Sequence, residues 1–282
     1  MRVAAVQMCS TPDAPANLAT ADRLVRRAAA DGARLVVLPE KWPCLGTGED
    51  VRAGAQRLDG PAITWARAIA AELGIDLVAG SLSQAPEDGA DRGANTSVHV
   101  GPGGDVRAVY RKVHMFDVVV DGVHHEESRY EAPGDELVVS ETADGTGLGL
   151  SICYDLRFPE LYRILALRGA RILVVPSAFT WATTLQHWEV LLRARAIEDQ
   201  CFVIAANQHS EHVPGARSGG HSMVVDPWGV VLARAGADAD AVVVADLDLD
   251  GLEAVRSSLP SLANRRPGAY AWPAASHPPR EG

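Results

Sequence analysis

The chain has 282 residues, of which 47% are hydrophobic, and a formal net charge of −10 at pH 7. This length and apolar content suffice for a large buried core, in one large domain or two small ones. An acidic chain without a basic tract is a poor candidate for binding nucleic acid or an anionic membrane, and we expect neither partner. No run of about 18 apolar residues occurs, so we expect no membrane-spanning segment.

Four cysteines, Cys9, Cys44, Cys153 and Cys201, lie far apart in the sequence without a CxxC pair. A chain of this size does not need disulfide bonds to hold its core, so we expect reduced thiols in a cytoplasmic protein. The N-terminal apolar run is too short for a signal peptide and predicts a strand instead.

The first third of the chain alternates between strand-like and helical patterns of hydrophobic residues. The expected strands cover 2–8, 34–39 and 75–79, and the expected helices cover 17–30 and 61–73. The unalternated apolar run at 34–39 suits a sheet that is covered on both faces. The segment 41–59, rich in glycine and charge, is expected to form a loop.

The rest of the chain continues this alternation. Gly101–Asp105 has the composition of a hairpin turn between strands expected at 95–100 and 106–110. Further strands are expected at 136–139, 148–152, 171–175, 201–206, 222–225, 230–233 and 241–246, and helices at 159–168, 184–199 and 249–259. Residues 118–134 are expected to be irregular.

No polar linker divides the chain, and strands alternating with helices predict one α/β domain. We assign that domain to residues 1–273 and expect a flexible C-terminal tail at 274–282.

Cys153 lies between the apolar strand pattern of 149–152 and a helical pattern that begins at Pro159. In α/β sheets, ligands bind at the carboxyl ends of strands. A thiol at such a strand end is flanked by backbone N–H groups that could stabilise a developing oxyanion. The alternative is a buried structural cysteine, because free cysteine is among the most buried residue types.

Glu40 and Lys112 also follow expected strands. If the three strands are neighbours in one sheet, the side chains of Glu40, Lys112 and Cys153 converge at one edge of it. A carboxylate can take the proton of a thiol, a thiolate can attack a carbonyl or nitrile carbon, and an ammonium can stabilise the tetrahedral oxyanion.

Four segments resemble the motifs of the nitrilase or carbon–nitrogen hydrolase superfamily. They are Leu38-Pro-Glu40, Tyr110-Arg-Lys112-Val-His, Glu127-Ser128 with Pro133-Gly134, and Cys153-Tyr-Asp-Leu-Arg-Phe-Pro-Glu160. The similarity covers nearly the whole chain. It implies an α/β fold, the four-layer αββα sandwich in which two mixed β-sheets face each other.

The resemblance also implies roles for individual residues. Cys153 would be the nucleophile, Glu40 the general base, and Lys112 the proton donor and oxyanion stabiliser. The backbone N–H of Tyr154 would share the oxyanion, and Glu127 would lie beside Lys112, orienting it or handling the attacking water. The implied reaction runs through a thioester at Cys153 and needs no metal and no organic cofactor.

The same roles lead to two expectations about protonation. Two acidic groups near the ammonium of Lys112 should favour its charged form, and a cation near Cys153 should favour the thiolate.

Within the superfamily the chain resembles the Nit-type amidases, and the deaminated glutathione amidases more than the ω-amidases. This rests on 176–179, 187–198 and 220–229 together with the Cys153 motif. The implied substrate is a small carboxylated amide. ω-Amidase, N-carbamoyl amidohydrolase, aliphatic amidase and nitrilase activities remain alternatives, as does a non-catalytic binding protein.

Three further residues are candidates for the pocket. Arg157 could bind a substrate carboxylate, because a guanidinium grips one bidentately, or it could form a structural or interface salt bridge. Phe179 and Thr180 follow another strand end and are expected to line the pocket, with loop packing as the alternative.

Three residues depart from the Nit-type pattern. Thr184 stands where those amidases usually carry glycine, and Trp42 and Trp181 are bulky for residues beside a pocket. These departures concern the identity of the substrate and leave the reaction type in place.

For the histidines, solvent-exposed or structural roles are favoured over metal-binding or catalytic ones. His124-His125-Glu126-Glu127 could suggest a metal site, but a solvated charged loop is favoured because no further ligands occur at zinc spacing. His187 and His221 are expected to be structural, since Glu40 already serves as the base.

The helix expected around 187–198 is amphipathic, and core packing is the default role of its apolar face. The superfamily pairs its subunits across helices near the nucleophile. The resemblance therefore implies a homodimer or a higher homo-oligomer.

Overall fold

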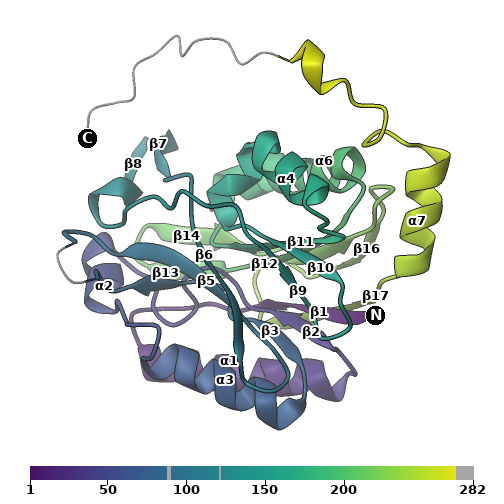
Figure 1. Ribbon diagram of the computed structural model, residues 1–282. Helices are drawn as coiled ribbons and strands as arrows, with labels where there is room; N and C mark the ends of the chain where they lie inside the picture. The colour runs from purple at the N-terminus through teal and green to yellow at the C-terminus, as the bar shows by residue number, and fades with distance from the viewer. Residues whose placement is uncertain (88–89, 121, 271–282) are drawn as a thin grey trace.

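The computed structural model describes residues 1–87, 90–120 and 122–270. Two β-sheets lie face to face at the centre of the molecule, and helices cover their outer faces (Figure 1). The predicted αββα sandwich is thereby confirmed. The tail expected at 274–282 lies outside the described residues.

The first sheet has seven strands in the order β17-β1-β2-β3-β5-β4, with β6 paired to β5. Its strands are β1 (Arg2–Gln7), β2 (Leu35–Val37), β3 (Asp76–Val78), β4 (Leu82–Gln84), β5 (Ala94–Val100), β6 (Val106–Arg111) and β17 (Ala241–Asp246). Strands β1, β2 and β3 run parallel and the remaining pairings are antiparallel, so the sheet is mixed as predicted.

The second sheet has six strands in the order β16-β15-β12-β11-β10-β9. Its strands are β9 (Val139–Glu141), β10 (Gly147–Leu150), β11 (Ile172–Ser177), β12 (Phe202–Asn207), β15 (Met223–Val225) and β16 (Val231–Arg234). Here β10, β11 and β12 form the parallel centre between antiparallel edges.

The helices pack on the outer faces of the two sheets (Figure 1). Helices α1 (Ala14–Ala30) and α3 (Pro61–Leu73) cover the first sheet, and α4 (Pro159–Leu167) and α6 (Glu189–Asp199) cover the second. Helix α7 (Leu249–Ser258) follows the last strand. Proline opens α3 and Gly74 ends it in the left-handed conformation, which are the positions that these residues favour at helix ends.

Alternate residues of β1 contribute to two different cores. Val3 and Ala5 belong to the core that includes the space between the sheets, whereas Ala4 and Val6 pack toward α1 and α3. Because successive side chains of a strand point to opposite faces, a strand covered on both faces needs an unbroken apolar run. The apolar runs of the sequence therefore predict the central strands well.

Six segments differ from the expectations. Strand β4 has no counterpart among the expected strands, and the strand expected at 136–139 is displaced to β9. The loop expected at 41–59 contains helix α2 (Gly48–Ala53), and the irregular segment at 118–134 contains a hairpin of β7 (Asp117–Val120) and β8 (Val123–Glu126) followed by the 3₁₀ turn η1 (Glu127–Arg129). A second hairpin pairs β13 (His209–Val213) with β14 (Ala216–Gly219). The helix expected at 184–199 begins earlier, as α5 (Trp181–Thr183), and passes through the π-helical turn η3 (Thr184–Trp188) before α6.

The start of α2 shows why the pattern of hydrophobic residues does not reveal short elements. Thr47 and Asp50 form a capping box, in which each side chain accepts a hydrogen bond from the other residue's backbone N–H. The helix is too short for a hydrophobic period to reveal it. Across the described part of the chain, no helix is both long and apolar enough to cross a membrane.

Candidate active site

The three motif residues come from both sheets. Glu40 follows β2 and Lys112 follows β6 in the first sheet, whereas Cys153 opens the 3₁₀ turn η2 (Cys153–Arg157) after β10 in the second. The condition that the three strands are neighbours in one sheet is therefore not met. The side chains meet because the strand ends of two facing sheets lie against each other.

Lys112 lies at the centre of this group of side chains. Its ammonium donates hydrogen bonds to Glu40 Oε1 at 3.0 Å and to both carboxylate oxygens of Glu127 at 3.0 and 2.8 Å. Burial alone lowers the pKa of Lys112, but the carboxylates of Glu127 and Glu40 outweigh it and raise that pKa well above its usual range. Lys112 is therefore a buried cation held by two anions.

Glu127 lies at the start of η1 and is fixed from several sides. Besides Lys112, it accepts hydrogen bonds from the backbone N–H of Phe116 at 2.8 Å and from the side-chain amide of Asn95 at 3.0 Å. Burial raises the pKa of Glu127, but the nearby cations Lys112 and Lys41 outweigh it and lower that pKa to about 2. Glu127 is therefore ionised at neutral pH.

Glu40 connects the two sheets through its second carboxylate oxygen. That oxygen accepts a hydrogen bond of 2.8 Å from the backbone N–H of Ala178, which follows β11 of the second sheet. The chain before Glu40 is also tightly packed, since a Cβ added to Gly80 would lie 2.0 Å from the carbonyl oxygen of Pro39. Only glycine fits there, in a left-handed conformation with φ of 47°.

Cys153 has a left-handed backbone with φ of 45° and is 8% exposed. Such a conformation is rare for a residue with a Cβ and is typical of strained turns at functional sites. Burial and then the Glu40 carboxylate raise the pKa of Cys153 well above its usual range, and Lys112 lowers it by less. Lys112 thus favours the thiolate in the expected direction, but burial and the Glu40 carboxylate outweigh it, so that the balance favours the thiol.

Asp155 anchors the turn that carries Cys153, a role that the sequence did not reveal. It is fully buried, and its Oδ2 accepts hydrogen bonds from the Tyr110 hydroxyl at 2.6 Å and from the N–H of Ile152 at 2.8 Å. Its Oδ1 lies 2.8 Å from Nδ1 of His114. These contacts connect the turn after β10 with the segment around Lys112.

Lys41 and Glu131 form a second buried ion pair, which sequence reasoning also missed. The ammonium of Lys41 lies 2.8 Å from Glu131 and 3.9 Å from Glu127, and both side chains of the pair are at most 11% exposed. Glu131 also accepts a hydrogen bond from Ser83. Charges of alternating sign therefore run from Glu40 through Lys112, Glu127 and Lys41 to Glu131.

These groups open onto a cavity of about 590 Å³. Each of the eight candidate residues lines it, namely Glu40, Lys112, Glu127, Cys153, Tyr154, Arg157, Phe179 and Thr180. The cavity also borders the β7–β8 and β13–β14 hairpins, which the sequence patterns did not predict.

Arg157 is held in the cavity wall by aromatic rings. Its guanidinium carbon lies 5.3 Å from the centre of the Phe179 ring and 5.9 Å from that of Tyr154, and its Nη1 lies 3.2 Å from Nδ1 of His187. Among the described residues, no carboxylate forms an ion pair with it.

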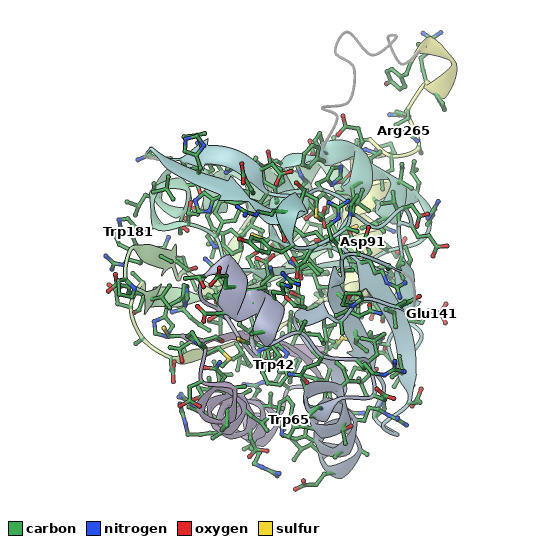
Figure 2. All side chains as sticks on the ribbon, turned by 90° about the vertical axis from the view of Figure 1, so that its left-hand side faces the viewer. Trp42, Trp65, Asp91, Glu141, Trp181 and Arg265 are labelled. Carbon is green, nitrogen blue, oxygen red and sulfur yellow. The ribbon has the colours of Figure 1, made fainter. Side chains whose placement is uncertain are left out.

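The residues that depart from the Nit-type pattern have separate surroundings. Trp42 is buried against Trp65 with its indole N–H bonded to the carbonyl of Ala79, so it packs near α1 and α3, apart from Trp181 (Figure 2). Trp181 does line the cavity. The hydroxyl of Thr184 donates to the carbonyl oxygens of the preceding turn, at Phe179 and Thr180.

The histidines contribute no metal cluster. Within 1–87, 90–120 and 122–270, no group of three or more His, Cys, Asp or Glu side chains is arranged to hold a metal ion. His124 and His125 line the cavity, and the ring of His125 packs against Phe116. His221 has its Nδ1 3.1 Å from the carbonyl oxygen of Ala235.

Residues 2–257 match the family model described as carbon–nitrogen hydrolase. The chain belongs to the carbon–nitrogen hydrolase family. It is an enzyme of the nitrilase superfamily, and it has relatives that are named as amidases.

Two relatives and one solved structure show how far the similarity extends. A deaminated glutathione amidase from Synechocystis sp. is 40% identical over 264 residues, which cover 93% of this chain and 97% of that protein. An omega-amidase from Homo sapiens is 36% identical over 271 residues, 96% of each chain. A mutant of the Nesterenkonia sp. AN1 amidase, with the acetamide moiety of fluoroacetamide added at its active-site cysteine, superposes with a TM-score of 0.80 at 29% identity and covers 95% of both chains.

The Lys41–Glu131 pair leads to a stability prediction. We expect Lys41→Met to lower the free energy of unfolding by about 3 kcal/mol, because it leaves a buried carboxylate without its cation. Lys41→Met combined with Glu131→Gln should lose less than the sum of the two single variants, since the double variant keeps neither charge. Urea denaturation of the four proteins measures this coupling.

The matched control is the Arg57–Asp59 pair, whose side chains are both 75% exposed. Arg57→Met should change the free energy of unfolding little, because exposed ion pairs contribute little. Additive losses at Lys41 and Glu131 would contradict the coupling that we assign to the buried pair.

Proposed function

We propose that this enzyme hydrolyses the amide bond of a small carboxylated substrate through a Glu40–Lys112–Cys153 triad and a thioester at Cys153. The activity it most resembles is that of the deaminated glutathione amidases. The observation that carries the proposal is the ammonium of Lys112, which contacts both Glu40 and Glu127 in a cavity that Cys153 also lines.

The first half of the reaction follows from the resting protonation states. Because Cys153 rests as a thiol, Glu40 takes its proton as the sulfur attacks the amide carbon. The carbonyl oxygen gains negative charge, which the ammonium of Lys112 and the backbone N–H of Tyr154 stabilise. The C–N bond then breaks, and the departing nitrogen receives the proton that Glu40 had taken, or one from Lys112.

The second half hydrolyses the acyl-enzyme. A water molecule loses a proton to Glu40 and attacks the thioester carbon, which releases the carboxylic acid and returns the proton to the sulfur. Glu127 orients Lys112 throughout, since both of its carboxylate oxygens accept hydrogen bonds from that ammonium. None of these steps requires a metal or an organic cofactor.

One observation supports a carboxylate on the substrate, and a second supports the size of the substrate. Arg157 borders the cavity, is held over two aromatic rings, and has no carboxylate partner among the described residues. A guanidinium in that state suits bidentate recognition of a carboxylate. The cavity volume of about 590 Å³ also lies within the range of pockets that enclose a molecule larger than a simple aliphatic amide.

ω-Amidase activity is the second candidate, and its support is the similarity to the human omega-amidase. Release of ammonia or amine from deaminated glutathione, α-ketoglutaramate, N-carbamoyl amino acids and nitriles separates the candidates.

The four cysteines form no disulfide, which supports a reducing, cytoplasmic compartment.

The triad makes a direct prediction. Cys153→Ala and Glu40→Gln should each lower kcat by at least about 10³-fold while the protein stays folded, because the nucleophile or its base is missing. Steady-state kinetics and thermal unfolding measure the two effects. Near-normal turnover by Cys153→Ser would contradict a thioester.

The role of Arg157 is tested by its conservative replacement. Arg157→Lys should raise KM for carboxylated amides by about 10-fold and leave KM for neutral amides almost unchanged, because lysine cannot grip a carboxylate bidentately. The two substrate classes are compared by initial rates. An equal effect on both would remove the assigned role.

We further propose a homodimer that pairs through the outer face of the second sheet's helices. Exposed apolar side chains gather on α4, on α6 and on the β15–β16 turn, namely Ile164, Leu167, Val190, Ile197, Trp228 and Val230. Ile197 packs against Gly229, so the α6 residues and the turn form one surface. Burying it against a second copy would remove apolar area from water.

Light scattering should therefore give a mass of twice 29.9 kDa for the native protein. Trp228→Glu should shift that mass toward the monomer, because it places a charge in the apolar interface. A native protein that is monomeric at micromolar concentration would contradict the dimer.

A further inference from the structure

Asn95, the second residue of β5, bridges two carboxylates of the site. Its side-chain nitrogen donates hydrogen bonds to Glu40 Oε1 at 2.8 Å and to Glu127 Oε1 at 3.0 Å. Both hydrogens of the amide are thereby used. The residue is fully buried, and neither the sequence motifs nor the triad includes it.

Lys112 contacts the same two oxygens, in addition to Glu127 Oε2. Its ammonium donates to Glu40 Oε1 and to Glu127 Oε1, at 3.0 Å in each case. The two carboxylate oxygens and the two nitrogens therefore alternate in a closed ring. The backbone N–H of Lys112 donates to the carbonyl of Asn95 at 2.9 Å, so the β5–β6 pairing brings both donors to one place.

Only one of the two orientations of the Asn95 side-chain amide is favourable here. Reversing it would direct the amide oxygen at two carboxylates, which would repel it. In the present orientation, Asn95 Oδ1 has no hydrogen-bond partner in the described part of the chain. An unpaired buried acceptor is unfavourable by itself, so the donor end must supply the benefit.

Asn95 contacts the carboxylates without lining the cavity itself. Glu40, Lys112 and Glu127 line the cavity, whereas Asn95 does not. It therefore has no route to the substrate except through the groups it holds. A loss of Asn95 should change the chemical step and leave substrate binding intact.

A neutral donor also suits this position electrostatically. Two carboxylates beside one lysine repel each other, and a second cation between them would weaken Glu40 as a base. An amide supplies a hydrogen bond to each carboxylate without adding charge.

We propose that Asn95 is a positioning residue that links the carboxylates of Glu40 and Glu127 beside Lys112, so that Glu40 stays directed at the Cys153 thiol. The proposal rests on the roles assigned to Glu40 and Cys153 under the proposed function.

The test uses Asn95→Leu, which is similar in size and donates no hydrogen bond, with Ser97→Ala as the matched control. Ser97 lies two residues further along β5, is fully buried, and has no hydrogen-bond partner for its hydroxyl among the described residues. Asn95→Leu should lower kcat by about 10²-fold with KM within about 2-fold, because the base is displaced while the pocket is not. Ser97→Ala should match the native enzyme in both.

Asn95→Asp supplies a second readout that a structural role would not produce. Its buried carboxyl beside two carboxylates would hold its proton more strongly than usual, and in that state it could donate one hydrogen bond. The activity of Asn95→Asp relative to the native enzyme should therefore be highest at acidic pH and fall as the pH rises. A ratio that is independent of pH, or a proportional rise in KM for either variant, would overturn the proposal.

The alkylation rate of Cys153 by iodoacetamide, followed by peptide mass spectrometry, tests Asn95 without any substrate. It should fall in Asn95→Leu and stay normal in Ser97→Ala. If the native enzyme cleaved no tested amide, the proposed function would fail, while this rate would still decide the role of Asn95. Equal rates in the native enzyme and Asn95→Leu would overturn that role.

Discussion

The structure depends on one buried ammonium shared by two carboxylates. Moving the charge of Lys112 out of water is unfavourable unless anions and further hydrogen bonds replace the lost hydration. Glu40 and Glu127 supply those anions from different parts of the chain, and Glu40 also bonds the backbone after β11. Neutralising this one cation therefore fixes the ends of β2, β6 and β11 and the turn η1 in a single arrangement.

That arrangement decides the chemistry of the thiol. An unpaired lysine beside Cys153 would favour a thiolate, but Lys112 already shares its charge with two carboxylates. The sulfur therefore keeps its proton until a base removes it, and Glu40 is the carboxylate beside it. Burial and the negative charge of Glu40, which raise the pKa of Cys153, are thus part of a mechanism in which proton transfer accompanies attack.

Much of the fold and of the candidate site was predictable from the sequence because it depends on local patterns. The apolar runs of β1 and β11 are readable in the sequence because both faces of their sheets are covered, and Pro61 with Gly74 marks the ends of α3. The positions of Glu40, Lys112 and Cys153 after strands indicated a site at strand ends. The motifs then implied that two sheets, rather than one, make up the fold.

The rest of the candidate site depends on contacts between segments that are distant in the sequence. Asn95 looks like any polar residue in a hairpin strand, and only the folded chain brings it within hydrogen-bonding distance of Glu40 and Glu127. Lys41 and Glu131 are 90 residues apart and have no pattern in common. The protonation of Cys153 depends on such contacts too, because only the folded chain shows that burial and the Glu40 carboxylate outweigh Lys112.

The most direct test of this account is the ultraviolet absorbance of thiolate in the native enzyme and in Cys153→Ser. Because the other three cysteines are common to both proteins, their difference spectrum reports the protonation state of Cys153 alone. The account predicts no difference in thiolate absorbance at neutral pH and the appearance of one only well into the alkaline range. A thiolate band at neutral pH that disappears in Cys153→Ser would contradict it.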